Sequence, residues 1–324
     1  MSGSRAVAPA VTTPRLGLPN LGFGLGLRSP HFPAWLRDGS RSDWIEAISE
    51  NFMDSRGRPR RLLRELAEQR PVVLHGVALS IGSTDPLDLA YLAALDDLAR
   101  EVDAPYVSDH LCWTGVGGEV SHDLLPIPRT EEALRHVVGR VGEVQDRLQR
   151  RLVLENPSRY LDFKASTLDE PSFLAAVAEE ADCGILLDLN NVVVTCRNEG
   201  SDPQAFVAAL PVERIVQVHV AGHVDLGTHL LDTHDAPVPD QVLGLLRELL
   251  ERAPELPVLL EWDAQLPTLA ELDDELDRVR AAARGETVAA SPLERSRSHE
   301  GGAPVPQPWP VMTPHWDAPR EPDA

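Results

Sequence analysis

Cysteine is scarce in this chain, and the three present, Cys112, Cys183 and Cys196, are irregularly spaced. That spacing does not match the disulfide framework of small secreted proteins. No apolar run is long enough to cross a bilayer, and the N-terminal region lacks the continuous apolar core of a signal peptide. The sequence therefore predicts a reducing, cytoplasmic setting and no association with a membrane.

Basic residues are also few. The 324 residues include 30 Lys and Arg against 51 Asp and Glu, which gives a formal net charge of −21. So large a negative excess argues against broad electrostatic binding to DNA, RNA or an anionic membrane. It does not exclude a local basic pocket. Hydrophobic residues make up 43% of the chain, enough to bury a substantial core in one large domain or two small ones.

The two ends of the chain differ in composition from its middle. Residues 1–19 are rich in Ala, Pro, Ser and Thr without a hydrophobic period, and residues 285–324 are rich in Pro, Ser and charge. We expect both segments to be disordered. Between them, residues 20–284 alternate short apolar stretches with amphipathic ones, which predicts a single α/β domain.

Eight strands are expected in this domain, each followed by a helix or loop that leads to the next. The pattern favours a (β/α)8 TIM barrel over a doubly wound open sheet, because an open sheet gives no reason to stop at eight. The expected strands are 21–27, 44–49, 71–76, 106–110, 151–157, 184–191, 215–220 and 257–262. The expected helices are 59–70, 86–102, 130–150, 170–181, 203–210, 239–252 and a last one that ends near 284.

Ionisable residues stand at the ends of six of these strands. In a (β/α)8 barrel the carboxyl ends of the strands converge on one face, where active sites are built. Six isolated polar ends would rarely all be His or carboxylate, so we expect these side chains to surround one cavity. They are His75, His110, Glu155, Asp188, His219 and Glu261.

The strand that ends near His219 has two different faces. Val216, Val218 and Val220 fall on one side, which we expect to pack on helices, and Gln217 and His219 fall on the other. A His on that second face needs a polar partner there.

The loop after this strand adds more residues of metal-binding types, namely His223, His229, Asp232 and His234. Imidazole and carboxylate together suit zinc, iron or manganese. The candidates exceed what one tetrahedral zinc requires. We therefore predict a site with two or three metal ions that share bridging carboxylates.

Eight short motifs, in order along residues 21–284, then point to one protein family. They are HGVALS from His75, SDHL from Ser108, DLLPIP from Asp123, LENPS from Leu154, LDLNN from Leu187, HVAGH from His219, DTH from Asp232 and EWD from Glu261. Together they resemble the multinuclear non-haem iron-dependent oxidases, the family of the methanobactin-synthesis oxidase subunit. The resemblance implies a (β/α)8 barrel with two or three irons in mixed Fe(II) and Fe(III) states and O2 as co-substrate. It further implies a ribosomally made precursor peptide as substrate, often modified at cysteine and usually presented by a partner protein.

The resemblance also assigns site residues, motif by motif. Asn190 and His223 are additional candidates for the metal site. The residues expected to serve catalysis most directly are His75, Asp188, His219 and Asp232. The implied metal ligands are His75, His110, Glu155, Asp188, His219, Asp232, His234 and Glu261.

Two positions depart from the family pattern. Asp109 stands where the family commonly has Glu before its His, so this shorter carboxylate either lies behind the ligands or binds differently. Glu199 stands where many members have His, which puts a third-metal contact there in question. Glu50 and Asn51, at the end of the second strand, are weaker candidates for orienting ligands or substrate.

Two other classes of function compete with the oxidase. A barrel of the xylose-isomerase or endonuclease type also binds two or three divalent ions, and would isomerise a sugar or hydrolyse a phosphodiester without redox chemistry. The acidic net charge disfavours the endonuclease. A non-catalytic metal-binding or peptide-binding scaffold is disfavoured by the near-complete ligand set. A serine nucleophile is disfavoured because no strand-turn-helix GxSxG motif is present.

Overall fold

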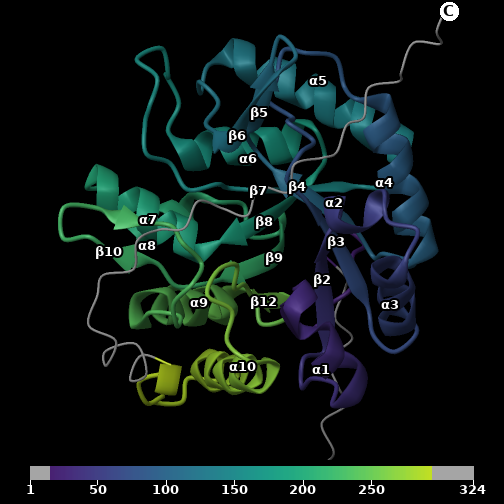
Figure 1. The fold of residues 1–324 in the computed structure, drawn as a ribbon. Coiled ribbons are helices and arrows are strands. Elements are labelled where there is room, and N and C mark those ends of the chain that lie inside the picture. The colour runs from purple at the N-terminus through teal and green to yellow at the C-terminus, as the bar shows by residue number, and fades with distance from the viewer. Residues whose placement is uncertain (1–14, 294–324) are drawn as a thin grey trace, which may run out of the picture.

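Eight parallel strands close into a barrel in the computed structural model, which describes residues 15–293 (Figure 1). This confirms the predicted (β/α)8 TIM barrel. Of the segments expected to be disordered, residues 1–14 and 294–324 lie outside the described residues. In spatial order the strands are β1 (Phe23–Leu27), β12 (Val258–Leu260), β9 (Ile215–Val220), β8 (Gly184–Asp188), β7 (Leu152–Glu155), β4 (Val107–His110), β3 (Val72–Gly76) and β2 (Trp44–Ile48).

Helices surround the barrel, as Figure 1 shows. In the longest, α5, Thr130 caps the first turn by accepting from Ala133 N, and apolar residues at helical spacing from Leu134 to Leu148 face the core. None of the helices in residues 15–293 combines the length and the apolar character needed to cross a membrane. The α-helices are α1 (Phe32–Arg37), α2 (Glu50–Met53), α3 (Arg58–Ala67), α4 (Leu89–Glu101), α5 (Glu131–Leu148), α6 (Glu170–Glu180), α7 (Leu189–Glu199), α8 (Pro203–Ala209), α9 (Asp240–Arg252) and α10 (Leu269–Ala283).

Two small hairpins follow barrel strands where the sequence predicted loops. After β4, the strands β5 (Trp113–Val116) and β6 (Glu119–Leu125) are joined by Gly117 and Gly118, whose φ angles are 65° and 80°. Asp85 accepts from both of these glycine N–H groups. After β9, the strands β10 (Val224–Asp225) and β11 (Leu230–Leu231) form the second hairpin. Both hairpins rise at the carboxyl end of the barrel because each continues directly from the end of a barrel strand.

The barrel interior has an apolar layer and, two residues further along the strands, an ionisable layer. The period of two places Val153 below Glu155, Leu186 below Asp188, and Leu259 below Glu261 on the same face of each strand. Leu16, Leu18 and Leu21 pack against the apolar layer. The ionisable groups thus stand on a packed apolar floor formed by Trp44, Val73, Tyr106, Val153, Leu186, Val216 and Leu259.

Two details of the predicted strands are wrong. Val216 belongs to the inner apolar layer rather than to the helix-facing side with Val218 and Val220, because the register of β8 and β9 shifts after Ile185. The strand expected at 184–191 ends at Asp188, where α7 begins at once. The Asp188 carboxylate caps this helix by accepting from Asn191 N, so a carboxylate of the barrel mouth also fixes the start of a helix.

Candidate metal centre

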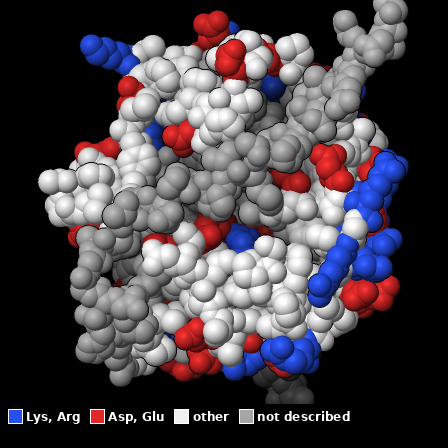
Figure 2. All heavy atoms as spheres, viewed as in Figure 1, with Lys and Arg blue, Asp and Glu red and all other residues white. Residues whose placement is uncertain are grey.

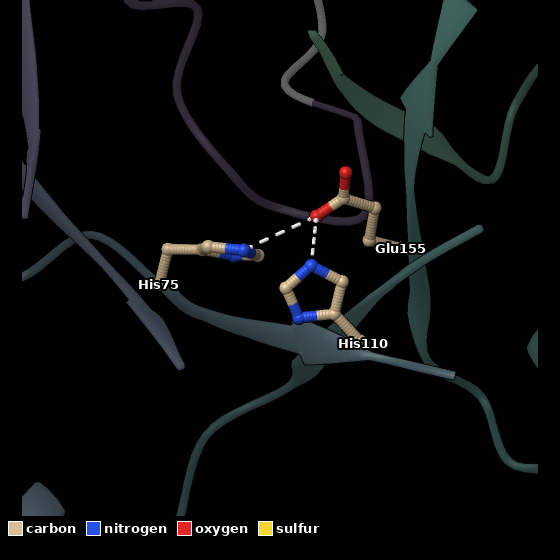
Figure 3. A group of neighbouring side chains, drawn as sticks. All are labelled: His75, His110 and Glu155. Atoms are coloured by element: carbon tan, nitrogen blue, oxygen red, sulfur yellow. Dashed lines mark ion pairs between the residues drawn. The ribbon is translucent and has the colours of Figure 1, made fainter. Parts of the chain in front are cut away.

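The first group at the barrel mouth consists of His75, His110 and Glu155, which come from the adjacent strands β3, β4 and β7. The Nε2 atoms of both histidines point to the same oxygen, Glu155 Oε2, at 3.1 Å from His75 and 3.3 Å from His110 (Figure 3). All three side chains are buried. Two imidazole nitrogens and a carboxylate oxygen therefore converge on one point, which is how three ligands of one metal ion are arranged.

The second group consists of Glu155, Asp188, His219 and Glu261. His219 Nδ1 lies 3.1 Å from Glu261 Oε2 and 3.5 Å from Glu155 Oε1. Glu155 is the member that both groups share, and its two oxygens face different groups. A carboxylate in this position is suited to bridge two metal ions.

A third set of side chains continues the network towards solvent. His234 Nε2 lies 3.2 Å from Asp188 Oδ2, and His234 Nδ1 lies 2.8 Å from Asp232 Oδ1. Asn190 Nδ2 donates to Asp232 Oδ1 at 2.8 Å, and Asn190 Oδ1 lies 2.7 Å from His223 Nδ1.

All ten predicted site residues are therefore joined in one network. Their individual roles as ligands stay predictions. His229, from the same loop, is exposed and contacts Thr228, so it lies outside the network.

Each histidine of the two inner groups has a second partner that fixes its ring. His75 Nδ1 lies 2.8 Å from Ser108 Oγ, and His110 Nδ1 lies 3.1 Å from the carbonyl oxygen of Gly76. His219 Nε2 lies 3.1 Å from the carboxylate of Glu46. Metal-binding histidines are typically held in this way, with the second nitrogen bonded to a carboxylate, carbonyl or similar group.

Glu46 was missed by the sequence analysis. It is 2% exposed, lies in the middle of β2, and accepts from Gln217 Nε2 at 2.6 Å as well as contacting His219. A carboxylate inside an otherwise apolar strand was the available indication, because such a group needs a buried polar partner. The sequence could not show which residue that partner is, because β2 and β9 come to face each other across the interior only when the barrel closes.

Arg28, directly after β1, is a second residue that the sequence analysis missed. It is 8% exposed and forms ion pairs with Asp263 at 2.5 Å and Glu261 at 3.4 Å. This cation holds one oxygen of Glu261 while the other faces His219. Arg28 therefore orients a candidate ligand.

The inner groups also contain buried atoms that lack an aligned hydrogen bond. Glu155 Oε2 and His219 Nδ1 are two of them, although oppositely charged atoms lie within 3.5 Å of each. Buried polar atoms normally have a hydrogen-bond partner. A cation between these atoms would supply that partner. The donors are imidazole and carboxylate without thiolate, a set that fits iron, manganese or zinc.

Without a cation, the histidines and carboxylates neutralise each other. Burial lowers the pKa of His75, but the adjacent carboxylate of Glu155 and the charge of Glu46 outweigh burial and raise the pKa to about 9. The pKa of His219 is raised well above its ordinary value, since the charges of Glu46 and Glu261 outweigh burial. The Glu155 pKa is held well below its ordinary value, because the charges of His110 and His219 overcome burial. A metal ion that binds His75 and His219 must displace the protons from their rings, so its binding should strengthen as the pH rises.

Asp109 and Glu199, noted in the sequence as departures, both have partners away from the ligand groups. Asp109 lies in β4, and its buried carboxylate, on the side of the strand that faces α4, accepts from His110 N at 2.7 Å and from Leu79 N at 3.2 Å. It supports the backbone of the His110 segment from behind. Glu199 forms an ion pair with Arg159 at 2.5 Å. Its carboxylate is therefore engaged by a cation.

The weaker candidate Glu50 is also engaged outside the network. Its Oε1 accepts from Val77 N, Ala78 N and the Tyr91 hydroxyl. Burial raises the pKa of Asp109 to about 8, and the nearby Glu50 charge adds to this. These two carboxylates brace the segment after β3 against α4.

Several solved structures share this fold. A 3-keto-D-glucoside 4-epimerase from E. coli aligns over 81% of this chain and 99% of its own, with a TM-score of 0.55 and 16% identity. Endonuclease IV from Thermus thermophilus aligns over 82% of this chain and 99% of its own, with a TM-score of 0.54 and 17% identity. At such low identity the likeness shows the fold alone.

Sequence relatives are much closer. A UPF0276 protein of Anaeromyxobacter sp. is 52% identical over 275 residues, which cover 85% of this chain and 96% of the relative. A UPF0276 protein of Caulobacter vibrioides is 47% identical over 80% of this chain and 93% of its own length. The family model for the RiPP precursor modification enzymes MbnB/TglH/ChrH, which act on ribosomally made peptides, matches residues 22–284. The chain belongs to the MbnB/TglH/ChrH family.

Proposed function

We propose that this protein is a multinuclear iron-dependent oxidase that uses O2 to modify a ribosomally made precursor peptide at a cysteine. The observation that carries the proposal is the place of Glu155 between two groups of ligand-type side chains. Two neighbouring metal positions are what a reaction needs when substrate and O2 must be activated side by side. Membership of a family of peptide-modifying enzymes supports the substrate class.

Iron bound in this site would supply one-electron chemistry and the activation of O2. The protein's own part is positioning. Ser108 and Glu46 hold the rings of His75 and His219, and Arg28 holds Glu261. Asp188, fixed at the start of α7, keeps one oxygen towards His234. Because these groups are buried, bulk water is kept from the reacting atoms.

A redox-silent reaction with divalent ions, as in an isomerase or a phosphodiesterase, is the alternative. The observation in its favour is that the same imidazole and carboxylate donors also suit zinc or manganese. Against the phosphodiesterase stands the net charge of −21, which repels nucleic acid. Metal identity separates the oxidase from both alternatives.

We further propose that a separate protein presents the peptide. Loops at the carboxyl end of the barrel carry exposed apolar side chains, including Val116 and Val120 on the β5–β6 hairpin and Leu226 on the β10–β11 hairpin. Val116 and Val120 belong to one hairpin, where they are available for contact with another protein. These short hairpins offer little surface to hold a long flexible peptide, whose ordering costs about 1–2 kcal/mol for each residue fixed.

The test is reconstitution with a cysteine-containing precursor peptide and a presenting partner, each to be identified among the genes that neighbour the gene of this protein. Iron-loaded protein, precursor, O2 and the co-encoded partner are expected to change the mass of the peptide. Leaving out iron or O2, or replacing the reacting cysteine of the precursor by serine, should abolish that change. Without the partner, turnover should fall by about 100-fold, because the peptide then loses the gain in effective concentration.

The partner proposal and the oxidase proposal can be rejected separately. Full turnover without any second protein would reject the partner proposal and leave the oxidase intact. An unchanged peptide mass in the complete mixture would reject the peptide oxidase.

A further inference from the structure

Five arginines lie within nine residues of an otherwise acidic chain, at Arg56, Arg58, Arg60, Arg61 and Arg64, and are here called the arginine patch. They occupy the loop before α3 and the first two turns of that helix. Basic side chains gather at the right-hand edge of the molecule in Figure 2, over α3 and α4. With 30 basic residues in 324, the chain average is far lower than five in nine, so the patch is a local concentration of charge.

The five arginines divide into two anchored ones and three available ones. Arg60 pairs with Glu101 at 2.6 Å and donates to the carbonyl oxygen of Met53, and Arg64 lies 3.3 Å from Glu101. The others are exposed and form no ion pair with any residue between 15 and 293. Three guanidinium groups are thus free to bind an anion, namely Arg56, Arg58 and Arg61.

Helix stability does not explain this arrangement. The N-terminus of a helix carries a partial positive charge, which favours acidic residues and disfavours basic ones. The first turn of α3 contains Arg58, Arg60 and Arg61 and no acidic residue. Its N-cap, Gly57, offers no side-chain hydrogen bond. The patch therefore concentrates positive charge where the helix itself is weakened by it.

An open hollow of about 600 Å³ adjoins the patch. It lies between α3 and α4 and reaches the end of α2, which directly follows the carboxyl end of β2. The hollow thus runs along the outside of the barrel, from α2 near the carboxyl end of β2 to the last turn of α4, where Arg60 and Arg64 meet Glu101. The hollow is lined by Met53, Asp54, Arg56, Arg60, Arg64, Ala94, Asp97 and Glu101.

We propose that Arg56, Arg58 and Arg61 bind an acidic segment of the precursor peptide, an inference that rests on the proposed function. Guanidinium groups bind carboxylates with two parallel hydrogen bonds, which suits Asp and Glu side chains. The remaining acidic surface repels such a segment and so directs it to the patch. A peptide whose reacting residue lies at the barrel mouth must leave over the rim. Even a weak contact on the outside of the barrel, beyond that rim, then raises the effective concentration of the reacting residue.

The experiment measures the binding of a fluorescein-labelled peptide of alternating Glu and Gly to the full chain by fluorescence anisotropy. The triple variant R56E/R58E/R61E is expected to bind it about tenfold more weakly than the natural chain. The matched control is R135E/R197E/R247E, which replaces three other exposed arginines that have no ion pair in the described structure. Both variants change the net charge equally, so a specific patch predicts near-natural binding by the control.

Three results would overturn the proposal. The first is that both triple variants bind the Glu peptide equally weakly. The second is that the natural chain does not bind this peptide at all. The third is that the natural chain binds a single-stranded oligonucleotide more tightly than the Glu peptide. Weakened binding of the presenting protein, with unchanged binding of the Glu peptide, would assign the patch to that protein instead. Because binding is measured without iron or O2, its failure is distinct from failure of the oxidase, which is detected by the mass of the precursor.

Discussion

Glu155→Ala is expected to remove nearly all bound iron and to lower peptide oxidation by about 100-fold or more. Glu155 is the member shared by the two ligand groups, and its two oxygens face His75 and His110 on one side and His219 on the other. Its loss therefore weakens both metal positions at once. Iron content by elemental analysis and turnover by mass spectrometry of the precursor are the readouts.

His110→Ala is the informative comparison, because His110 belongs to one group only. It should lower the iron content by less than Glu155→Ala does. Two histidine substitutions outside the network serve as controls, and both should leave iron content and turnover near those of the natural protein. His229 is exposed, and His136 bonds to the carbonyl oxygen of Ser83. The control variants are His229→Ala and His136→Ala. Full iron occupancy in Glu155→Ala would remove this residue from the metal centre and with it the bridging arrangement.

Gly222→Ala is expected to lower both the unfolding temperature and the iron content, although Gly222 offers no ligand atom. A Cβ at this position would overlap the carbonyl oxygens of Ala236 and Pro237, which are backbone atoms and cannot rotate away. The segment that must shift follows Asp232 and His234 directly, so these two side chains would be displaced. Overpacking of this kind costs about 1–3 kcal/mol of stability.

Gly142→Ala is the matched control for that substitution. Gly142 lies within α5, and apart from its chain neighbours and the backbone of its own helix no atom lies within 4 Å of its added Cβ. Alanine favours a helix over glycine by about 1 kcal/mol, so this variant should be as stable as the natural protein or more so. If Gly222→Ala has the unfolding temperature and the iron content of the natural protein, the loop tolerates the displacement and this prediction is wrong.

The strands were predictable because apolar residues recur with the right spacing and their ends carry ionisable groups. The α7 helix was not, since Leu189 and the run from Val192 to Val194 are buried and continue the apolar pattern of β8. Periodicity does not separate a buried helix from a buried strand. The β5–β6 hairpin was missed for the opposite reason. Its second strand is largely exposed and has no apolar face to reveal it.

The candidate site was predictable where residues end strands or follow a family motif, as with His75, Asp188 and Glu261, which the structure brings together. Glu46 and Arg28 required the structure. Glu46 meets His219 across 173 residues of sequence, and Arg28 meets Glu261 across 233. Such pairs arise only when the barrel closes. Glu199 is a further example, because its ion pair with Arg159 could not be predicted from the sequence.

The metal content of the natural protein tests the central claim most directly. The chain should be purified without oxygen and without added metal, and its metals counted by elemental analysis. Two groups of imidazole and carboxylate donors around a shared Glu155 predict about two to three irons per chain. One tightly bound zinc per chain, with no iron, would contradict the multinuclear iron centre and favour a redox-silent barrel.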